Sequence, residues 1–469
     1  MLELVKKNIH MNRFKSNAAT QVTLDDDFIV PDTMEDMARI ILSSGGIQIE
    51  SVKNQGERVI IKGKLDFQVL YRNVEGGFQT MAGHIPFEEP INVPGLEEKD
   101  YLGVIGELDD LTAGMINSRK ISAKAIVSLG VRVETLYDAE AAVDVMESGA
   151  NSLENSWSTG DLDSNSWGAS SYDMENKDGE KSSYPLAADT SSDGMEILRR
   201  QADVAVIAVR RKDTDRIKED ISLSGSKPSI EQILWSEIRL RGTTTKPLDG
   251  RIHVEGEVMI FAIYTGEGEN TPVQWLEESI PFAGEVELPE AVEGMVPSIS
   301  VRLVHKELEA KPDYDGEMRD LELDAVLELD MKLYEEQQIE LLGDFYSNDR
   351  ELDLEFGEVC FDRLLSKNTG KCRVAEKLDL NSSDRILQIC HNDGTIKIDD
   401  VEIREDSLQI DGVLEVSLLY LTSDDSEPVK ADTEMVPFHY EAETPGITPD
   451  SVYQLNTGLE QMTAVMTGS

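Results

Sequence analysis

The sequence is poor in cysteine, in basic residues and in long apolar runs. Its three cysteines, Cys360, Cys372 and Cys390, fall in the last third of 469 residues, and no C-x-x-C motif occurs. An odd number of widely spaced thiols is typical of core cysteines in a reducing compartment. The first twenty residues lack the apolar stretch of a signal peptide, and no run approaches the ~18 apolar residues of a membrane helix. We therefore expect a cytoplasmic protein.

Basic residues are outnumbered two to one. Lys and Arg number 44 and Asp and Glu number 92, which gives a formal net charge of −48. Such a surface repels phosphate backbones and anionic bilayers, so we expect no nucleic-acid binding and no membrane insertion. The charge suits a basic protein partner or cations, and it is equally consistent with a solvated acidic surface.

Signatures of catalysis are also missing. The six histidines are scattered, and no G-x-G-x-x-G, Walker A, G-x-S-x-G or H-E-x-x-H motif occurs. Residues 161–168 resemble the start of a calcium loop, but Ser166 and Tyr172 occupy the positions that require glycine and glutamate. We expect no cofactor, no metal site and no enzymatic activity.

What the chain does contain is a repeat, which occurs three times. Each copy has a glycine, a tyrosine eight residues later, a Pro-Phe pair, and a second proline seven residues after the phenylalanine. The residues of the motif are Gly63, Tyr71, Pro86 and Phe87; Gly256, Tyr264, Pro281 and Phe282; and Gly412, Tyr420, Pro437 and Phe438. A triplicated pattern without nucleophile, base or metal ligand suits multivalent binding better than catalysis.

The residues around each glycine alternate between apolar and polar. Period two predicts a strand with one buried face, and the glycine within it predicts a bulge or bend. The Pro-Phe segment predicts a returning edge strand, because proline cannot donate a ladder hydrogen bond. Helical spacing of apolar residues at 31–42 and 228–234 predicts a short helix or turn. The fold expected is mainly β: three β-sandwich or partly open barrel modules with short helices.

Four segments follow from this pattern. We expect module 1 at 1–146, a linker at 147–194, module 2 at 195–347 and module 3 at 348–469. Module 3 lacks the last strand pair of the others, because the chain stops at Ser469. This indicates a truncated chain, a clipped gene model, or a unit that another chain completes.

The role of some aromatic residues can be interpreted in two ways. The linker is rich in Ser, Asp, Asn and Gly, and it contains Trp157 and Trp167, which are either partner contacts or incidental. The repeated tyrosines and phenylalanines fit strand core positions, and they would also suit a glycan-binding face.

Several phrases carry a family resemblance: DDDFIVPDTMEDMARI near the N-terminus, the G-x7-Y strand, the IPF strand, and LLGDFYSNDRELDLE. With these the chain resembles the SipL-like SPOCS-domain proteins of Clostridia, over almost its whole length. The resemblance implies a cytoplasmic protein on the mother-cell side of the forespore surface, which associates with a spore-morphogenetic ATPase and has no catalytic residues. The LysM module usual at the C-terminus of such proteins is not present in this sequence.

The function expected is a non-enzymatic adaptor or scaffold of the spore coat or cell envelope that acts through protein–protein contacts. The alternative is a glycan- or peptidoglycan-binding protein.

Overall fold

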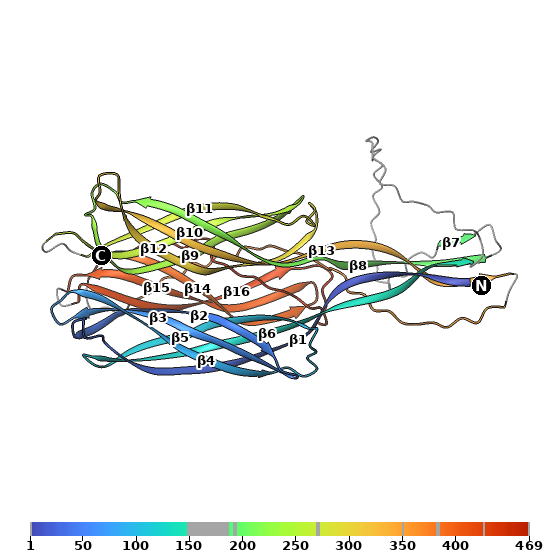
Figure 1. The fold of residues 1–469 in the computed structure, drawn as a ribbon, viewed down its shortest axis with the longest axis horizontal. Coiled ribbons are helices and arrows are strands. Elements are labelled where there is room, and N and C mark those ends of the chain that lie inside the picture. The colour runs from blue at the N-terminus through green and yellow to red at the C-terminus, as the bar shows by residue number, and fades with distance from the viewer. Residues whose placement is uncertain are drawn as a thin grey trace. The chain divides into compact units, whose positions relative to one another are not determined.

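β-strands form nearly all of the regular structure, and their order recurs from copy to copy (Figure 1). The computed structural model describes residues 2–147, 187–190, 195–268, 273–348, 351–380, 385–424 and 427–467, and these include no helix. The prediction of a mainly β chain with three repeated modules is confirmed, and the short helices are not found.

The chain divides into two units. A smaller unit consists of Met1–Met11, Asp138–Val206 and Glu336–Arg363, and a larger unit contains Asn12–Tyr137, Ile207–Glu335 and Leu364–Ser469. All three copies of the glycine–tyrosine motif belong to the larger unit.

The first copy is a sandwich of two three-stranded sheets, with the orders β2-β3-β4 and β1-β6-β5. Its strands are β1 (Leu2–Ile29), β2 (Met37–Asn54), β3 (Arg58–Asn73), β4 (Phe78–Asn92), β5 (Tyr101–Asn117) and β6 (Lys120–Glu147). Alternate apolar side chains of the two middle strands meet between the sheets, from Val59 to Tyr71 on β3 and from Ile121 to Val133 on β6. Each is at most 3 % exposed, so the period-two pattern marks the core face.

The second copy repeats this arrangement. Its sheets have the orders β11-β10-β9 and β12-β13-β8-β7. The strands are β7 (Ala187–Thr190), β8 (Met195–Ser222), β9 (Ile230–Leu248), β10 (Arg251–Gly266), β11 (Gln274–Glu287), β12 (Val296–Pro312) and β13 (Met318–Ser347). The alternate residues from Leu321 to Leu333 on β13 are fully buried against those of β10.

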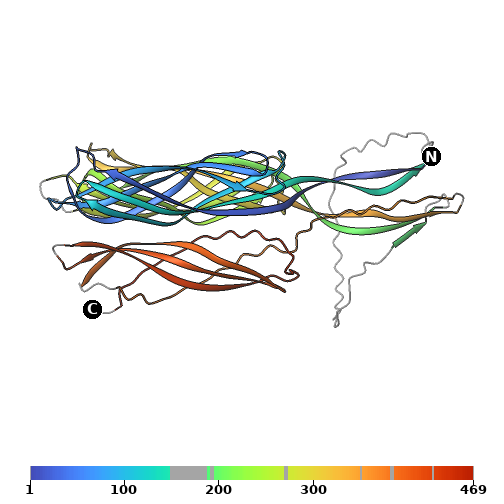
Figure 2. The same cartoon turned by 90° about the horizontal axis from the view of Figure 1, so that it is seen from below.

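The third copy has one sheet among its described residues. Its order is β14-β15-β16, from β14 (Ile386–Arg404), β15 (Ser407–Thr422) and β16 (Val429–Glu443). Residues 351–380 and 448–467 belong to no strand. Figure 2 shows this sheet in orange, with extended brown segments running alongside it.

Of the two segments predicted as a short helix or turn, residues 31–36 do form a turn before the first strand, whereas residues 37–42 and 230–234 are strands in which bulges imitate helical spacing. Met37 and Ile40 are three residues apart, yet they pair with Asn73 and Tyr71, which are two apart, since a bulge adds one residue to β2. The same shift occurs in β9, where Ile230 pairs with Gly266 and Ile233 with Tyr264. The extra residue turns a spacing of two into a spacing of three, which a short sequence window cannot distinguish from a helix.

The smaller unit has its own apolar core. The end regions of β1, β6, β8 and β13 supply it, and its buried residues are Ile9, Met11, Ala139, Ala141, Val204 and Ile339. Phe361 packs against this cluster from the segment that follows β13.

Candidate functional site

The repeated glycine and phenylalanine are cross-strand partners. The three pairs are Gly63–Phe87, Gly256–Phe282 and Gly412–Phe438. A Cβ atom on Gly63 would lie 2.7 Å from Cζ of Phe87 and 2.5 Å from the carbonyl oxygen of Gln48. The glycine therefore leaves room for the phenyl ring and for the neighbouring backbone. A phenylalanine at the paired position thus requires a residue without a Cβ opposite it.

The strand irregularity expected at the glycine lies at this point in each copy. In the first copy the register on the β2 side shifts between Ile49 and Ser51, directly opposite Gly63. In the third copy it shifts between Ile398 and Asp400. The extra residue in these two copies belongs to the neighbouring strand rather than to the glycine's own strand.

The three tyrosines are core residues. Tyr71, Tyr264 and Tyr420 are at most 1 % exposed. The hydroxyl of Tyr71 donates to Oε1 of Gln79 at 2.9 Å, and that of Tyr420 donates to Oδ2 of Asp432 at 2.5 Å. A buried phenol with a hydrogen-bond partner stabilises the sandwich and offers no face to a glycan.

The repeated prolines lie on outer strands. Pro86 is in β4, Pro281 in β11 and Pro437 in β16, and each of these strands is at the edge of its sheet. All three prolines are exposed. They restrict pairing of the edge with a further strand, since each removes one backbone donor.

The two candidate contact tryptophans, Trp157 and Trp167, lie outside the described residues, and so does the calcium-loop-like run at 161–168. The proposal that the tryptophans contact a partner stays a prediction. Among the described residues there is no group of His, Cys, Asp and Glu that would hold a metal ion.

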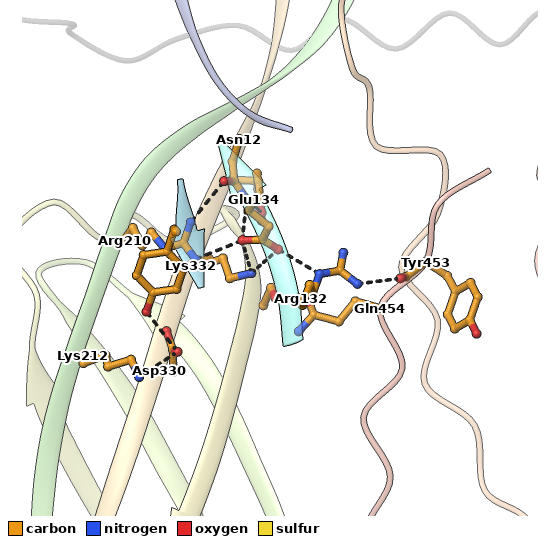
Figure 3. Close-up of polar contacts among 12 residues, drawn as sticks. Asn12, Arg132, Glu134, Arg210, Lys212, Asp330, Lys332, Tyr453 and Gln454 are labelled. Carbon is orange, nitrogen blue, oxygen red and sulfur yellow. Dashed lines mark hydrogen bonds and ion pairs between the residues drawn. The ribbon is translucent and has the colours of Figure 1, made fainter. Parts of the chain in front are cut away.

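A buried cluster of charges lies where the first and second copies meet (Figure 3). At its centre is Glu134 of β6, whose side chain is 4 % exposed. Nζ of Lys332, from β13, is 2.8 Å from both carboxylate oxygens. Arg210 of β8 lies 3.0 Å from Oε2, and Arg132 lies 3.0 Å from Oε1. One carboxylate of the first copy thus meets two cations of the second copy, Lys332 and Arg210, and one cation of its own strand, Arg132.

Neutral and aromatic groups complete this cluster. The amide of Asn12 donates to Oε2 of Glu134 at 3.1 Å and to the hydroxyl of Tyr334 at 3.0 Å. The guanidinium of Arg210 lies 3.1 Å from the ring centre of Tyr101, a cation–π contact. Donor groups of Lys332, Arg210, Arg132 and Asn12 thus all contact this carboxylate (Figure 3).

These contacts keep Glu134 ionised. Burial raises the pKa of its carboxyl group, but the hydrogen bonds and the charge of Lys332, aided by Asn12 and Arg132, lower it from 4.5 to about 2. Burial in turn lowers the pKa of the Lys332 ammonium, against the effect of Glu134. The adjoining recess measures about 40 Å³, room for a water molecule but not for a metabolite. The arrangement suits a structural ion cluster rather than a general acid or base.

A second polar cluster joins the second and third copies. Asp393 of β14 lies 2.9 Å from Nη2 of Arg241 and 2.5 Å from Nε of Arg239, both on β9. His391 stacks on Phe261 of β10 with ring centres 4.0 Å apart. His391 therefore serves as a packing residue between the second and third copies.

Sequence reasoning missed both clusters. Lys332 lies between the core residues Met331 and Leu333, and Glu134 directly follows the core residue Val133, so the alternating pattern predicts a solvent-facing side chain at both positions. The pattern of one strand indicates its inner face, but it holds no sign that another copy covers the outer face.

All three copies match one protein-family model. The family is described as SipL, SPOCS domain, and its matches are residues 36–116, 229–311 and 385–467. Together they span more than half of the chain. Each match covers the first sheet of a copy and the segment that follows it, and the third match includes residues 452–467. No match was found among curated proteins or among solved structures. The chain therefore belongs to the SipL SPOCS-domain family and contains three copies of its domain.

Proposed function

We propose that this protein is a non-enzymatic scaffold of spore-coat or cell-envelope morphogenesis that acts through protein–protein contacts. The observation that carries the proposal is the threefold SPOCS-domain match, since the family is sporulation-related. Each copy uses its motif residues for packing, which leaves the outer surfaces for contacts with other proteins.

Two features of the larger unit support a scaffold. The motif glycines, phenylalanines and tyrosines build a sandwich core and a glycine–aromatic pair, and their contacts supply no chemistry. Polar clusters centred on Glu134 and Asp393 hold the three copies together. Linked copies present several surfaces at fixed spacing, which favours multivalent binding.

The proposed partner and compartment rest on what the resemblance to this family implies. We propose the mother-cell cytoplasm, at the forespore surface, as the site of action, and a spore-morphogenetic ATPase among the partners. Among the described residues there is no apolar helix of the length that a bilayer requires.

The experiment is affinity purification of the tagged full chain from sporulating and from vegetative cells. The proposal predicts that coat or envelope proteins, including the ATPase, are enriched from sporulating cells. An equally acidic unrelated protein with the same tag is the control for charge-driven capture. Recovery of no coat or envelope protein above that control would contradict the proposal.

A further inference from the structure

One end of the first copy's sandwich exposes several large apolar side chains. Ile29 is 71 % exposed, Val74 61 %, Ile116 52 % and Met115 45 %. Ile29 ends β1, Val74 follows β3, and the other two lie near the end of β5. We name these four residues the tip patch. Single exposed apolar residues are common on protein surfaces, but several at one place mark a binding surface.

Hydrogen bonds and an ion pair hold the segments of the tip patch together. The backbone N–H of Val74 donates to the carbonyl oxygen of Asp36 at 2.9 Å, and that of Val30 donates to the carbonyl oxygen of Arg119 at 2.9 Å. Arg119 also pairs with Asp36, with Nη1 3.3 Å from Oδ1. The end of β1, the β3–β4 turn and the β5–β6 turn therefore meet around this pair. Because packed sheets are only ~10 Å apart, the tip-patch residues lie around one end of the sandwich.

Arg119 also holds the loop between β1 and β2 in one conformation. Its guanidinium donates to the carbonyl oxygens of Met34 at 2.7 Å, Val30 at 3.1 Å and Pro31 at 3.1 Å. A loop that is fixed in this way has little conformational entropy left to lose when a partner binds. The tip patch is therefore a preorganised surface, which lowers the cost of binding.

The second copy has the same hydrogen bonds at the corresponding end of its sandwich. The N–H of Leu223 donates to the carbonyl oxygen of Arg319 at 2.8 Å, and the N–H of Glu267 donates to that of Ser229 at 2.8 Å. These bonds repeat those around Arg119, so the two ends correspond residue by residue.

The residues that correspond to the tip patch are nevertheless polar. In the second copy Ser222 takes the place of Ile29, and Glu267 takes that of Val74. In the third copy Ser423 follows the motif tyrosine by three residues, as Val74 does in the first. The fold therefore does not require apolar side chains at this end. Their presence in the first copy alone favours a contact that the other copies do not make.

The surroundings of the tip patch are acidic. Residues 25–36 contain six acidic residues and no basic one. Asp27 is neutralised by Lys120 at 2.6 Å. Asp26, Glu35 and Glu75 are exposed, and none of them has an ion pair within the part of the chain that the structure describes. An apolar centre with an acidic rim is complementary to apolar residues that stand beside lysine or arginine.

The same charges disfavour a second copy of this chain as the occupant. Two tip patches that faced one another would bring their acidic rims together, and each chain has a net charge of −48. Like charges across an interface repel, and an anionic bilayer would be repelled in the same way. The complementary occupant is a basic polypeptide.

We propose that the tip patch binds one segment of a partner protein, an amphipathic segment that combines apolar residues with lysine and arginine. Its apolar side chains cover Ile29 and Val74, and its cations meet Asp26, Glu35 and Glu75. A few desolvated apolar anchors supply most of the affinity, and the charges supply specificity and a fast association rate. The inference deepens the proposed scaffold function, and it rests on that function only for the identity of the partner.

The test selects binders to the purified full chain from a displayed library of random dodecapeptides. Fluorescence anisotropy then measures binding of the enriched peptides, and hydrogen exchange locates it. We expect these peptides to combine apolar residues with lysine or arginine and to bind saturably. Exchange should slow in residues 29–37, 73–77 and 115–119.

Two variants separate the apolar and the charged contributions. Ile29→Ser/Val74→Glu gives the first copy the residues that the second copy has at these positions, so it should fold. It should weaken binding ~10-fold or more, because it removes two anchors. Asp26→Asn/Glu35→Gln/Glu75→Gln should also weaken binding ~10-fold, and it should reduce the dependence of binding on salt concentration.

The matched control is Val292→Ser/Tyr314→Glu, which introduces the same polar residues at positions of the second copy that are 51 % and 103 % exposed. It should bind like the unmodified chain. Absence of enriched peptides, equal binding to Ile29→Ser/Val74→Glu, or protection elsewhere would overturn the proposal. So would self-association that this variant abolishes, seen by sedimentation, because a second copy would then be the occupant. None of these results depends on the pull-down from sporulating cells, so the two proposals fail separately.

Discussion

At the scale of single residues, the missing Cβ of the motif glycine sets how closely three strands approach. A Cβ on Gly412 would lie 2.4 Å from the carbonyl oxygen of Lys397 and 3.0 Å from Cζ of Phe438. A Cβ on Gly256 would have nothing nearer than 3.1 Å. The same motif position is therefore tight against backbone in the first and third copies and looser in the second.

This difference predicts a graded response to alanine. We expect Gly63→Ala and Gly412→Ala to destabilise the protein by about 2–4 kcal/mol, because a backbone carbonyl cannot move aside as a side chain can. Gly256→Ala should cost about 1 kcal/mol or less. Scanning calorimetry of the full chain gives the shifts in melting temperature. Gly46→Ala on β2 is the control, because its Cβ would meet nothing within 4 Å. Equal losses at Gly46 and Gly63 would contradict the steric argument.

At the scale of elements, strands of different copies are joined through buried charge. Glu134 of β6 and Lys332 of β13 are each at most 10 % exposed at the side chain, and they face one another across the two copies. Removing one partner of a buried pair leaves the other charge desolvated, which costs more than the pair itself contributes.

We predict that Glu134→Gln lowers the free energy of unfolding by about 3 kcal/mol at pH 7. The pKa of Glu134 is about 2 when folded and near 4.5 when unfolded, so its contribution is complete above pH ~4.5. That contribution is lost as the pH falls toward 2. The difference in free energy of unfolding between Glu134→Gln and the parent protein should therefore shrink over this range. Urea unfolding at several pH values measures it.

Glu140→Gln is the matched control for that series. The side chain of Glu140 is 66 % exposed and pairs with Lys6 at 3.3 Å. An exposed pair contributes at most about 1 kcal/mol, so the change should be small at every pH. If the destabilisation of Glu134→Gln relative to the parent stayed constant from pH 7 to pH 2, the charge of the carboxylate would not be its cause.

At the scale of the larger unit, the first sheets of all three copies share an apolar cluster. Leu70 of β3, Trp235 of β9 and Leu419 of β15 are buried in it, with Phe261 and Cys390 beside them. Burial raises the pKa of the Cys390 thiol to about 11, so this cysteine is an unreactive packing residue. Residues of all three copies therefore pack on one another in this cluster.

Trp235→Ala should therefore uncouple the copies. Trp235 is 2 % exposed, and its removal should cost about 3–5 kcal/mol. We expect the main calorimetric transition to broaden or split, because contacts between copies weaken while each sandwich core stays intact. Tyr314→Ala is the control, at a fully exposed turn residue. A uniform shift of one sharp transition would contradict the idea that this cluster couples the copies.

Particular residues show which parts of the fold the sequence alone predicts. Alternation around Gly63, Gly256 and Gly412 determined the strands, the buried face and the threefold repeat, because period two is a local property of the chain. It was consistent with core positions for the tyrosines, which a glycan-binding face would also have suited, and the structure buries all three of them. It could not separate a bulged strand from a short helix at Met37 or Ile230, because the extra residue is recognised only from its pairing partner.

Only the tertiary structure decided what the outer faces meet. Glu134, Lys332 and Asp393 look like solvent-facing charges in their strands, and they are buried because a second copy lies against them. The pairing of each motif glycine with its phenylalanine likewise depends on strand register across two elements. Local pattern fixes the strands of this protein, and long-range packing fixes which of their faces are covered.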